Sequence, residues 1–187
     1  MNKKKIDYFT ALYEVVKVVN ASLDPARVLE EIVRCVARTM NVKASSLRLL
    51  DSRSKRLVMR AAYGLSEKYL RKGPILVAES GIDQKALQGE TIWLPDVTTD
   101  KDFQYGVMAR EEGIKSVLVV PLTLEQKAIG VLRVYTAAVR EFTQEDITFL
   151  LAVANVSAIA LDNARMHQTL QTQCDLMKAH KYRIDDN

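Results

Sequence analysis

The sequence has little of the chemistry from which metal sites, disulfide frameworks and nucleophilic active sites are built. Its 187 residues include two cysteines and two histidines, and no CxxC or HxxxH spacing occurs. Cys35 and Cys174 lie far apart, with no signal peptide before them, so a disulfide framework is not expected. His167 and His180 lie near the C-terminal end. We therefore expect no metal site and no His-ligated haem within the folded core.

Other classes of protein are excluded by further absences. Cys174 and His167 stand seven residues apart, two helical turns, which is too far for a nucleophilic pair. The sequence has no glycine-rich phosphate loop and no Arg/Lys stripe interleaved with aromatic residues, so nucleic-acid binding is not expected. The longest apolar-rich run, Ile147–Leu161, is shorter than the roughly 20 residues that span a bilayer. These features predict a cytoplasmic protein that is not an enzyme, with no cofactor and no membrane contact.

The composition is that of a soluble globular protein. The chain is 48% hydrophobic and 27% charged, with a net charge of +4. Its length suits one domain with an appended element. We interpret the mild positive charge as that of solvated side chains on the surface.

A central hairpin is the strongest structural signal. Two apolar, β-branched runs, Val117–Leu122 and Ala128–Tyr135, are separated by polar residues 125–127. Both runs are nearly continuous in apolar character, so both faces of the sheet should be covered. Pro121 predicts a bulge or strand end, and Gly130 predicts a close backbone approach or a bulge.

Helices are predicted on either side of the sheet-forming segments. Residues 5–20 have helical apolar spacing, and Asp24 followed by Pro25 starts a second helix. Thr143, with Asp146 three residues later, forms a capping box that starts a long helix. Shorter strands and helices are expected between these elements, namely strands at 47–50, 57–63, 74–78 and 91–94 and helices at 83–88 and 107–112. Loops are expected at 65–73 and 97–106.

The long last helix is apolar on nearly all sides. Only Thr148, Asn155 and Ser157 are polar between Ile147 and Leu161. Such a helix must be buried on more than one side, which predicts a homodimer through a helical bundle. The alternative is that the first helix of the same chain covers the second side.

The chain after residue 166 is predicted to be a separate element. The domain is assigned to residues 1–166, and residues 167–187 form a C-terminal helical extension or tail. This extension has a weak coiled-coil seam. No output module follows it, so either the output is a separate partner protein or the chain is a fragment of a larger signalling protein.

Several short motifs in order resemble the GAF domain family. The upstream pairs Gly81-Ile82 and Gly89 with Asp96 resemble its middle. The C-terminal half is similar in the order and spacing of Ser116, Pro121-Leu122, Ile129-Gly130-Val131-Leu132, Phe142-Thr143, Asp146 and Asn163-Ala164. The resemblance covers roughly residues 8–166. It implies an α+β fold, with an antiparallel sheet of five or six strands between a helical layer and a loop and short-helix layer over a pocket.

The resemblance places a small-molecule pocket between the sheet and residues 75–115. Apolar walls with a few polar groups suit such a site. For the aromatic candidates the alternative is simple core filling, and for Asp96 it is turn capping. Arg133 shares a strand face with Val131 and Tyr135, so it either lines the pocket or lies at an exposed sheet end. The candidate ligand-binding residues are Trp93, Asp96, Phe103, Tyr105, Met108, Ser116 and Arg133.

Some activities of the family are not expected here. No cysteine lies between residues 36 and 173, which argues against methionine sulfoxide reduction and bilin attachment. Phe103 is not followed by the Asp-Glu pair of the cyclic-nucleotide-binding subgroup. Two hypotheses remain: a non-enzymatic sensor that binds an unknown small molecule and dimerises through its terminal helices, and a ligand-free dimerisation or scaffold module.

Overall fold

The computed structural model describes residues 7–22, 24–51, 53–97 and 103–185, with side chains up to Lys178. Six strands form one sheet in the order β3-β2-β1-β6-β5-β4, and every neighbouring pair is antiparallel. The strands are β1 (Ala44–Asp51), β2 (Arg56–Tyr63), β3 (Ile75–Leu76), β4 (Ile92–Leu94), β5 (Ser116–Leu124) and β6 (Lys127–Thr136). The predicted α+β architecture with five or six antiparallel strands is confirmed.

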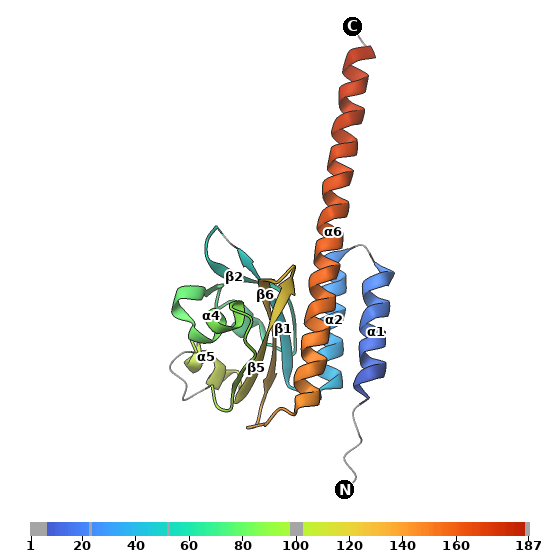
Figure 1. Ribbon diagram of the computed structural model, residues 1–187. Coiled ribbons are helices and arrows are strands. Elements are labelled where there is room, and N and C mark those ends of the chain that lie inside the picture. Colours follow the sequence, from blue (N-terminus) through green and yellow to red (C-terminus); the bar gives the residue numbers. More distant parts are fainter. Residues whose placement is uncertain (1–6, 23, 52, 98–102, 186–187) are drawn as a thin grey trace.

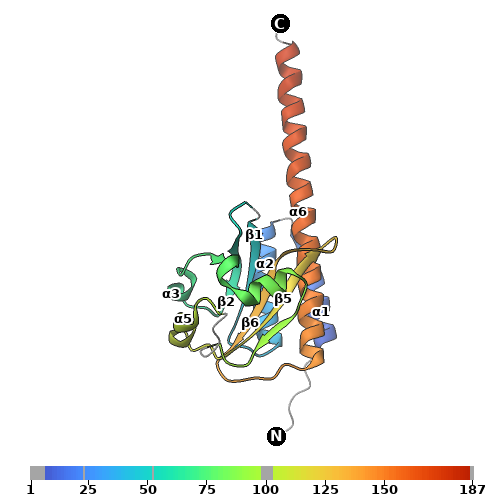
Figure 2. The same ribbon diagram turned by 60° about the vertical axis from the view of Figure 1, so that its left-hand side comes forward.

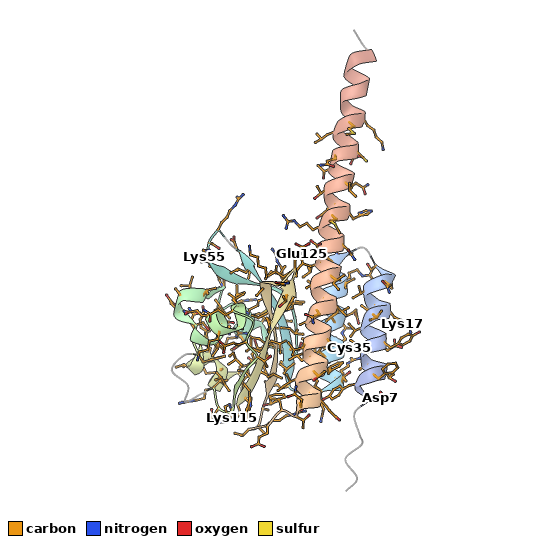
Figure 3. All side chains as sticks on the ribbon, in the orientation of Figure 1. Asp7, Lys17, Cys35, Lys55, Lys115 and Glu125 are labelled. Carbon is orange, nitrogen blue, oxygen red and sulfur yellow. The ribbon has the colours of Figure 1, made fainter. Side chains whose placement is uncertain are left out.

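Three helices form a layer on one face of the sheet (Figure 1). They are α1 (Tyr8–Ala21), α2 (Pro25–Thr39) and α6 (Gln144–Asp185). α2 and α6 pack directly on the strands, and α1 packs on both of these helices from outside. The ring of Tyr8 stacks on that of Phe149 at 4.6 Å between centroids. Cys35, the cysteine on α2, lies half-buried on this helical side of the sheet (Figure 3).

Short helices and loops cover the opposite face (Figure 2). They include α3 (Glu67–Leu70), the 3-10 helix η1 (Val77–Glu79), α4 (Gly81–Leu87) and α5 (Gly106–Glu111). The sheet therefore separates two apolar cores. Leu118, Leu132 and Val134 belong to the helical side, whereas Val131 and Tyr135 belong to the short-helix side. This division follows from the alternation of side chains along each strand.

The predicted helix starts and the central hairpin are confirmed. The backbone amide of Asp146 donates to Thr143 Oγ1 at 3.1 Å, and that of Thr143 donates to Asp146 Oδ2 at 2.8 Å, which is the reciprocal capping box. Asp24 accepts from the amide of Ala26 at the start of α2. The β5–β6 turn has positive φ at Glu125 and at the residue after it, as a two-residue hairpin turn requires.

Several predicted boundaries differ from the structure. The strand predicted at 74–78 has two residues, because Val77 turns the chain into η1. The segment 65–73, predicted as loop, contains α3, which Ser66 caps by accepting from the amide of Tyr69. The expected loop at 97–106 falls partly outside the described residues. α6 runs without interruption from Gln144 to Asp185, so the predicted helical extension from residue 167 continues the same helix.

The second half of α6 extends well beyond the body of the domain (Figure 1). By length and composition, Gln144–Lys178 contains a window apolar enough to cross a membrane, with 33% of that window buried. Core helices of soluble proteins meet the same criterion. In the first half of α6, Leu150, Val153 and Ala154 are fully buried against the sheet and the neighbouring helices, so this half belongs to the core of the domain.

Candidate functional site

Two arginines lie side by side on the short-helix face of the sheet. In the β1–β6 register, Arg48 is opposite Val131 and Arg133 is opposite Ser46. Cross-strand partners share a face, so both guanidinium groups project into the layer beneath α3 and α4. Each arginine is 1% exposed. Two buried cations on neighbouring strands require partners or a bound group.

Asp83 supplies a carboxylate to one of these arginines. It is fully buried in the first turn of α4, and its Oδ1 accepts from Nη2 of Arg133. Its Oδ2 accepts from Oγ of Ser80 at 2.6 Å. Burial alone would lower the pKa of Arg133, but the Asp83 charge outweighs it and the pKa is raised. Asp83 therefore keeps Arg133 charged and holds it in one orientation.

Arg48 is less well satisfied. Its Nη1 donates to the carbonyl oxygen of Leu57 at 3.4 Å. Its Nε and Nη2 find no acceptor among the residues that the structure describes. Burial lowers the pKa of Arg48, and the nearby charge of Arg133 adds to this effect. Nε and Nη2 of Arg48 can each donate at least one further hydrogen bond.

Lys72 brings a third basic group to the same place. Its Nζ lies 3.5 Å above the ring centroid of Tyr69 and 4.6 Å from that of Tyr105. That nitrogen is buried and has no hydrogen-bond acceptor in the described part of the chain. Burial lowers the pKa of Lys72 to about 6, and the charges of Arg48 and Arg133 lower it further.

Tyrosines form the rest of the polar cluster. Tyr69 and Tyr135 meet edge to face, with ring centroids 6.4 Å apart. The Tyr135 hydroxyl is 2.9 Å from Oγ of Ser46. The Tyr69 hydroxyl is buried and has no partner within the described ranges. We call Arg48, Arg133, Lys72, Asp83, Tyr69 and Tyr135 the basic cluster.

A surface hollow of about 310 Å³ shares Tyr69 with the basic cluster. Met108, Glu111 and Glu112 also line it. A larger hollow of about 800 Å³ lies between α2, α6 and the β5–β6 turn and has no residue in common with the cluster. We place the candidate site at the cluster, because buried donors without acceptors indicate a bound group more directly than volume does. Among the described residues, no group of three or more His, Cys, Asp or Glu side chains could hold a metal ion.

The structure brings some of the sequence-predicted residues to this site. Arg133 lies in the basic cluster, and its predicted alternative place at an exposed sheet end is wrong because the side chain is buried. Tyr105 contacts Lys72, and its hydroxyl donates to the carbonyl oxygen of Pro74 at 3.1 Å. Phe103 is buried in the apolar core of this side, and Met108 lies at the rim of the hollow.

Three predicted residues lie elsewhere. Trp93 is opposite Leu118 in the β4–β5 register, which places it on the helical face, and its Nε1 donates to the Arg140 carbonyl oxygen at 3.1 Å. Ser116 Oγ accepts from the amide of Arg140 at 3.0 Å and donates to the carbonyl oxygen of Pro95 at 2.6 Å. Oδ2 of Asp96 lies 3.8 Å from Nζ of Lys115. Trp93 and Ser116 therefore join the sheet edge to the segment before α6.

Sequence reasoning missed most of the basic cluster. Arg48 follows Leu47 and precedes Leu49, so it carries the same signal as Arg133: a charge within an apolar strand. Lys72 and Asp83 carry no such signal, because they belong to segments that are polar in sequence. Their burial depends on how the short-helix layer folds over the sheet.

Replacing Lys72 with methionine should change how stability depends on pH. The pKa of Lys72 is about 6 in the folded protein and about 10.4 in an unfolded chain, so the unfolded state binds more protons between these values. The Lys72 contribution to stability therefore rises as the pH increases from about 6 towards 10. We expect the difference in unfolding free energy between the wild type and Lys72→Met to shift in favour of the wild type over this range.

The measurement is urea unfolding of the ligand-free protein at several pH values from 6 to 9.5. Lys85→Met, at an exposed position on α4, is the matched control. Its unfolding free energy plotted against pH should run parallel to that of the wild type. A parallel curve for Lys72→Met as well would contradict the buried, depressed ammonium. The charged and titratable groups that act on Lys72 are Arg48, Arg133, Asp83 and Glu112, with Tyr69 and Tyr105 in ring contact.

Comparison with known proteins agrees with this architecture. The family model described as GAF domain matches residues 22–162, and the chain belongs to the GAF domain family. Members of this family are generally regulatory domains of larger signalling proteins.

The similar proteins are distant relatives. The nitrogen fixation protein VnfA of Azotobacter vinelandii is 24% identical over 165 residues, which are 84% of this chain and 31% of that protein. The chain therefore spans about a third of that relative's length. The GAF domain of a phosphoenolpyruvate-protein phosphotransferase from Coxiella burnetii has a TM-score of 0.79 at 21% identity, covering 89% of this chain and 99% of that one.

A third similar protein is an enzyme. The free methionine-R-sulfoxide reductase of Neisseria meningitidis, solved in complex with its substrate, has a TM-score of 0.74 at 22% identity. The match covers 89% of this chain and 95% of that one. At this level of identity the two structural likenesses show a shared fold.

Proposed function

We propose that this GAF domain is a non-enzymatic sensor that binds a small molecule at the basic cluster and dimerises through α1 and α6. The observation that carries the proposal is the set of buried donors on Arg48, Arg133 and Lys72 that the described chain leaves without acceptors. Native proteins satisfy buried polar groups, and a ligand is one way to do so. The proposed ligand contacts include Arg48, Lys72 and Tyr69 in place of the predicted Trp93, Asp96 and Ser116.

The position of the cysteines supports a regulatory role over a redox one. Cys35 packs between α2 and α1 on the helical side of the sheet, with its Sγ 4.0 Å from the carbonyl oxygen of Ala11. Burial raises its pKa, which disfavours the reactive thiolate. Cys174 is exposed on the extended part of α6. Neither thiol lies at the basic cluster.

Exposed apolar side chains support dimerisation through the helices. Phe9, Tyr13 and Val16 follow one stripe of α1 and are 84%, 58% and 37% exposed. On α6, apolar residues recur at spacings of seven and four along one side, which is the pattern of a coiled-coil seam. The exposed members of this seam are Ile159, Met166, Leu170 and Met177. α1 of the same chain covers part of α6 but leaves Ile159 54% exposed.

Strand β6 can transmit the effect of ligand binding from the basic cluster to the helical layer. Arg133 lies on β6 between Leu132 and Val134, whose side chains pack on the helical side. A ligand that favours one position of Arg133 would bias the packing of these neighbours and so the α6 pair that leads to an output partner. We place the protein in the cytoplasm, without nucleic-acid or membrane contact.

The test is native mass spectrometry of the purified full chain, first under gentle and then under denaturing conditions. We expect a dimer with an additional small mass that is lost on denaturation. Ile159→Asp should shift the protein to monomer, because a charge in an apolar seam opposes association. Val139→Asp, at an apolar residue 63% exposed outside the helices, is the matched control and should remain dimeric.

The outcomes separate the two functional hypotheses. A dimer without additional mass would favour a scaffold role over sensing. A monomeric wild type would contradict dimerisation through α1 and α6.

A further inference from the structure

We propose that the ligand is a small acid whose carboxylate or phosphate group binds between Arg48, Arg133 and Lys72. This inference deepens the proposed function and rests on it, since it assumes that the basic cluster is the ligand site. The shared chemistry is two adjacent oxygen atoms that carry negative charge.

The charge balance of the cluster is the first argument. Among the described residues, three basic side chains face one carboxylate, that of Asp83, which is already engaged by Arg133 and Ser80. Even with the Lys72 amine neutral, the two arginines exceed this carboxylate by one positive charge. Among the residues that the structure describes, the glutamates of the short helices pair elsewhere: Glu112 with Ser66 and Lys43, Glu111 with Lys68, Glu67 with Arg71, and Glu79 with Gln104. A neutral ligand would leave the excess positive charge buried, whereas an anion would neutralise it.

The geometry of Arg48 is the second argument. Its Nη1 is used by the Leu57 carbonyl oxygen, and the two nitrogens without a described acceptor are Nε and Nη2. These two nitrogens form one edge of the guanidinium plane, with parallel N–H bonds. That edge matches the two oxygens of a carboxylate or phosphate in a bidentate contact. Arg48 is thus the residue that determines the planar, two-oxygen specificity.

Arg133 and Lys72 contribute in different ways. Nε of Arg133 is buried and has no acceptor in the described ranges, while Asp83 holds the other end of this guanidinium. Asp83 is therefore a positioning residue and does not itself attract an anion. Nζ of Lys72 rests on the Tyr69 ring and can turn towards a bound oxygen.

Anion binding should also be coupled to proton uptake. Burial lowers the pKa of Lys72 to about 6, so its amine is mostly neutral at pH 8 without a ligand. A bound anion would raise that pKa and restore the ammonium form. Binding should consequently take up as much as one proton per site, and the affinity should fall as the pH rises above 7. Arg48 and Arg133 oppose this protonation, and Asp83 and Glu112 favour it.

The experiment measures binding of sodium acetate, succinate and inorganic phosphate to the dialysed full-length chain. Binding is followed by thermal shift and by isothermal titration calorimetry, and the effect of each anion is compared with that of sodium chloride at matched ionic strength. We expect saturable stabilisation beyond chloride by at least one of the three anions. A response to acetate or succinate identifies a carboxylate ligand, and a response to phosphate alone identifies a phosphate ester. Titration at pH 8 in buffers of different ionisation enthalpy should reveal the proton uptake.

Variants separate binding from folding. Arg48→Met should weaken the anion that binds best at least tenfold, while the anion-free variant melts at the same or a higher temperature because a buried unpaired charge has been removed. Arg48→Lys keeps the charge but loses the two-nitrogen edge, so it should also bind more weakly. Arg60→Met, at an exposed arginine on the neighbouring strand, is the matched control and should bind like the wild type.

Three results would overturn the inference. One is the absence of any effect beyond chloride for all three anions. Another is unchanged binding by a folded Arg48→Met variant. The third is native mass spectrometry showing a neutral ligand, which would leave the proposed sensor function standing. A protein with no co-purified mass and no anion response would instead count against the sensor function itself.

Discussion

Asp83→Asn is expected to lower the free energy of unfolding of the ligand-free protein by about 3–5 kcal/mol. The substitution keeps the shape of the side chain but removes the charge that compensates Arg133. Arg133 is 1% exposed, so its charge cannot be solvated by water instead. It would join Arg48 as a second buried arginine without a counter-charge among the described residues. Urea unfolding followed by circular dichroism measures the loss.

The double variant Asp83→Asn/Arg133→Met is the control for the mechanism. It removes both charges, so it should recover a large part of the stability lost in the single variant. Asp51→Asn, at an exposed carboxylate in the β1–β2 turn, should change stability much less. A loss below about 1 kcal/mol for Asp83→Asn would mean that Arg133 has another source of compensation.

Gly130→Ala is the second substitution with a large expected effect, about 2–3 kcal/mol of lost stability. A Cβ at this position would lie 2.2 Å from the carbonyl oxygen of Arg48 and 3.1 Å from Cα of Leu49. Both are backbone atoms of β1, so no side-chain rotation relieves the overlap. The two central strands would have to move apart at the point from which Arg48 enters the basic cluster. The same urea unfolding assay measures the effect.

A matched glycine shows whether the effect comes from this close approach. At Gly106, at the start of α5, the nearest atom to an added Cβ is the Val97 carbonyl oxygen at 3.4 Å, an ordinary contact. Gly106→Ala should therefore change stability by less than about 1 kcal/mol, in either direction. Equal effects at Gly106 and Gly130 would contradict the proposed steric cause.

Much of the framework could be predicted from local patterns. The hairpin of β5 and β6 follows from two β-branched runs around a polar break, and the start of α6 from the capping box of Thr143 and Asp146. The close approach at Gly130 follows from a glycine within a strand. For the hairpin and the capping box the interacting residues are neighbours in sequence, so the pattern that specifies each element is contained within it. For Gly130 the sequence predicts only that some backbone comes close, because its partner Arg48 lies on the distant strand β1.

The alternation of side chains along each strand decided which candidate residues face the site. Trp93 lies on β4, whose neighbours Ile92 and Leu94 pack towards the short-helix core. A strand shows alternate residues to alternate faces, so Trp93 must face the helices. Predicting this from sequence would require the register of a three-residue edge strand, which local propensity does not provide.

Local sequence patterns were enough to predict the class of fold, the order of its main elements and the presence of a charge, Arg133, within a covered strand. The tertiary structure alone decided what surrounds that charge. Asp83 meets Arg133 across 50 positions of sequence, and Lys72 and Tyr69 arrive from a segment with no regular apolar pattern. These contacts are long-range, and their burial arises only when the short-helix layer closes over the sheet. Local patterns could therefore predict the sheet, whereas the basic cluster depends on the packing of distant segments.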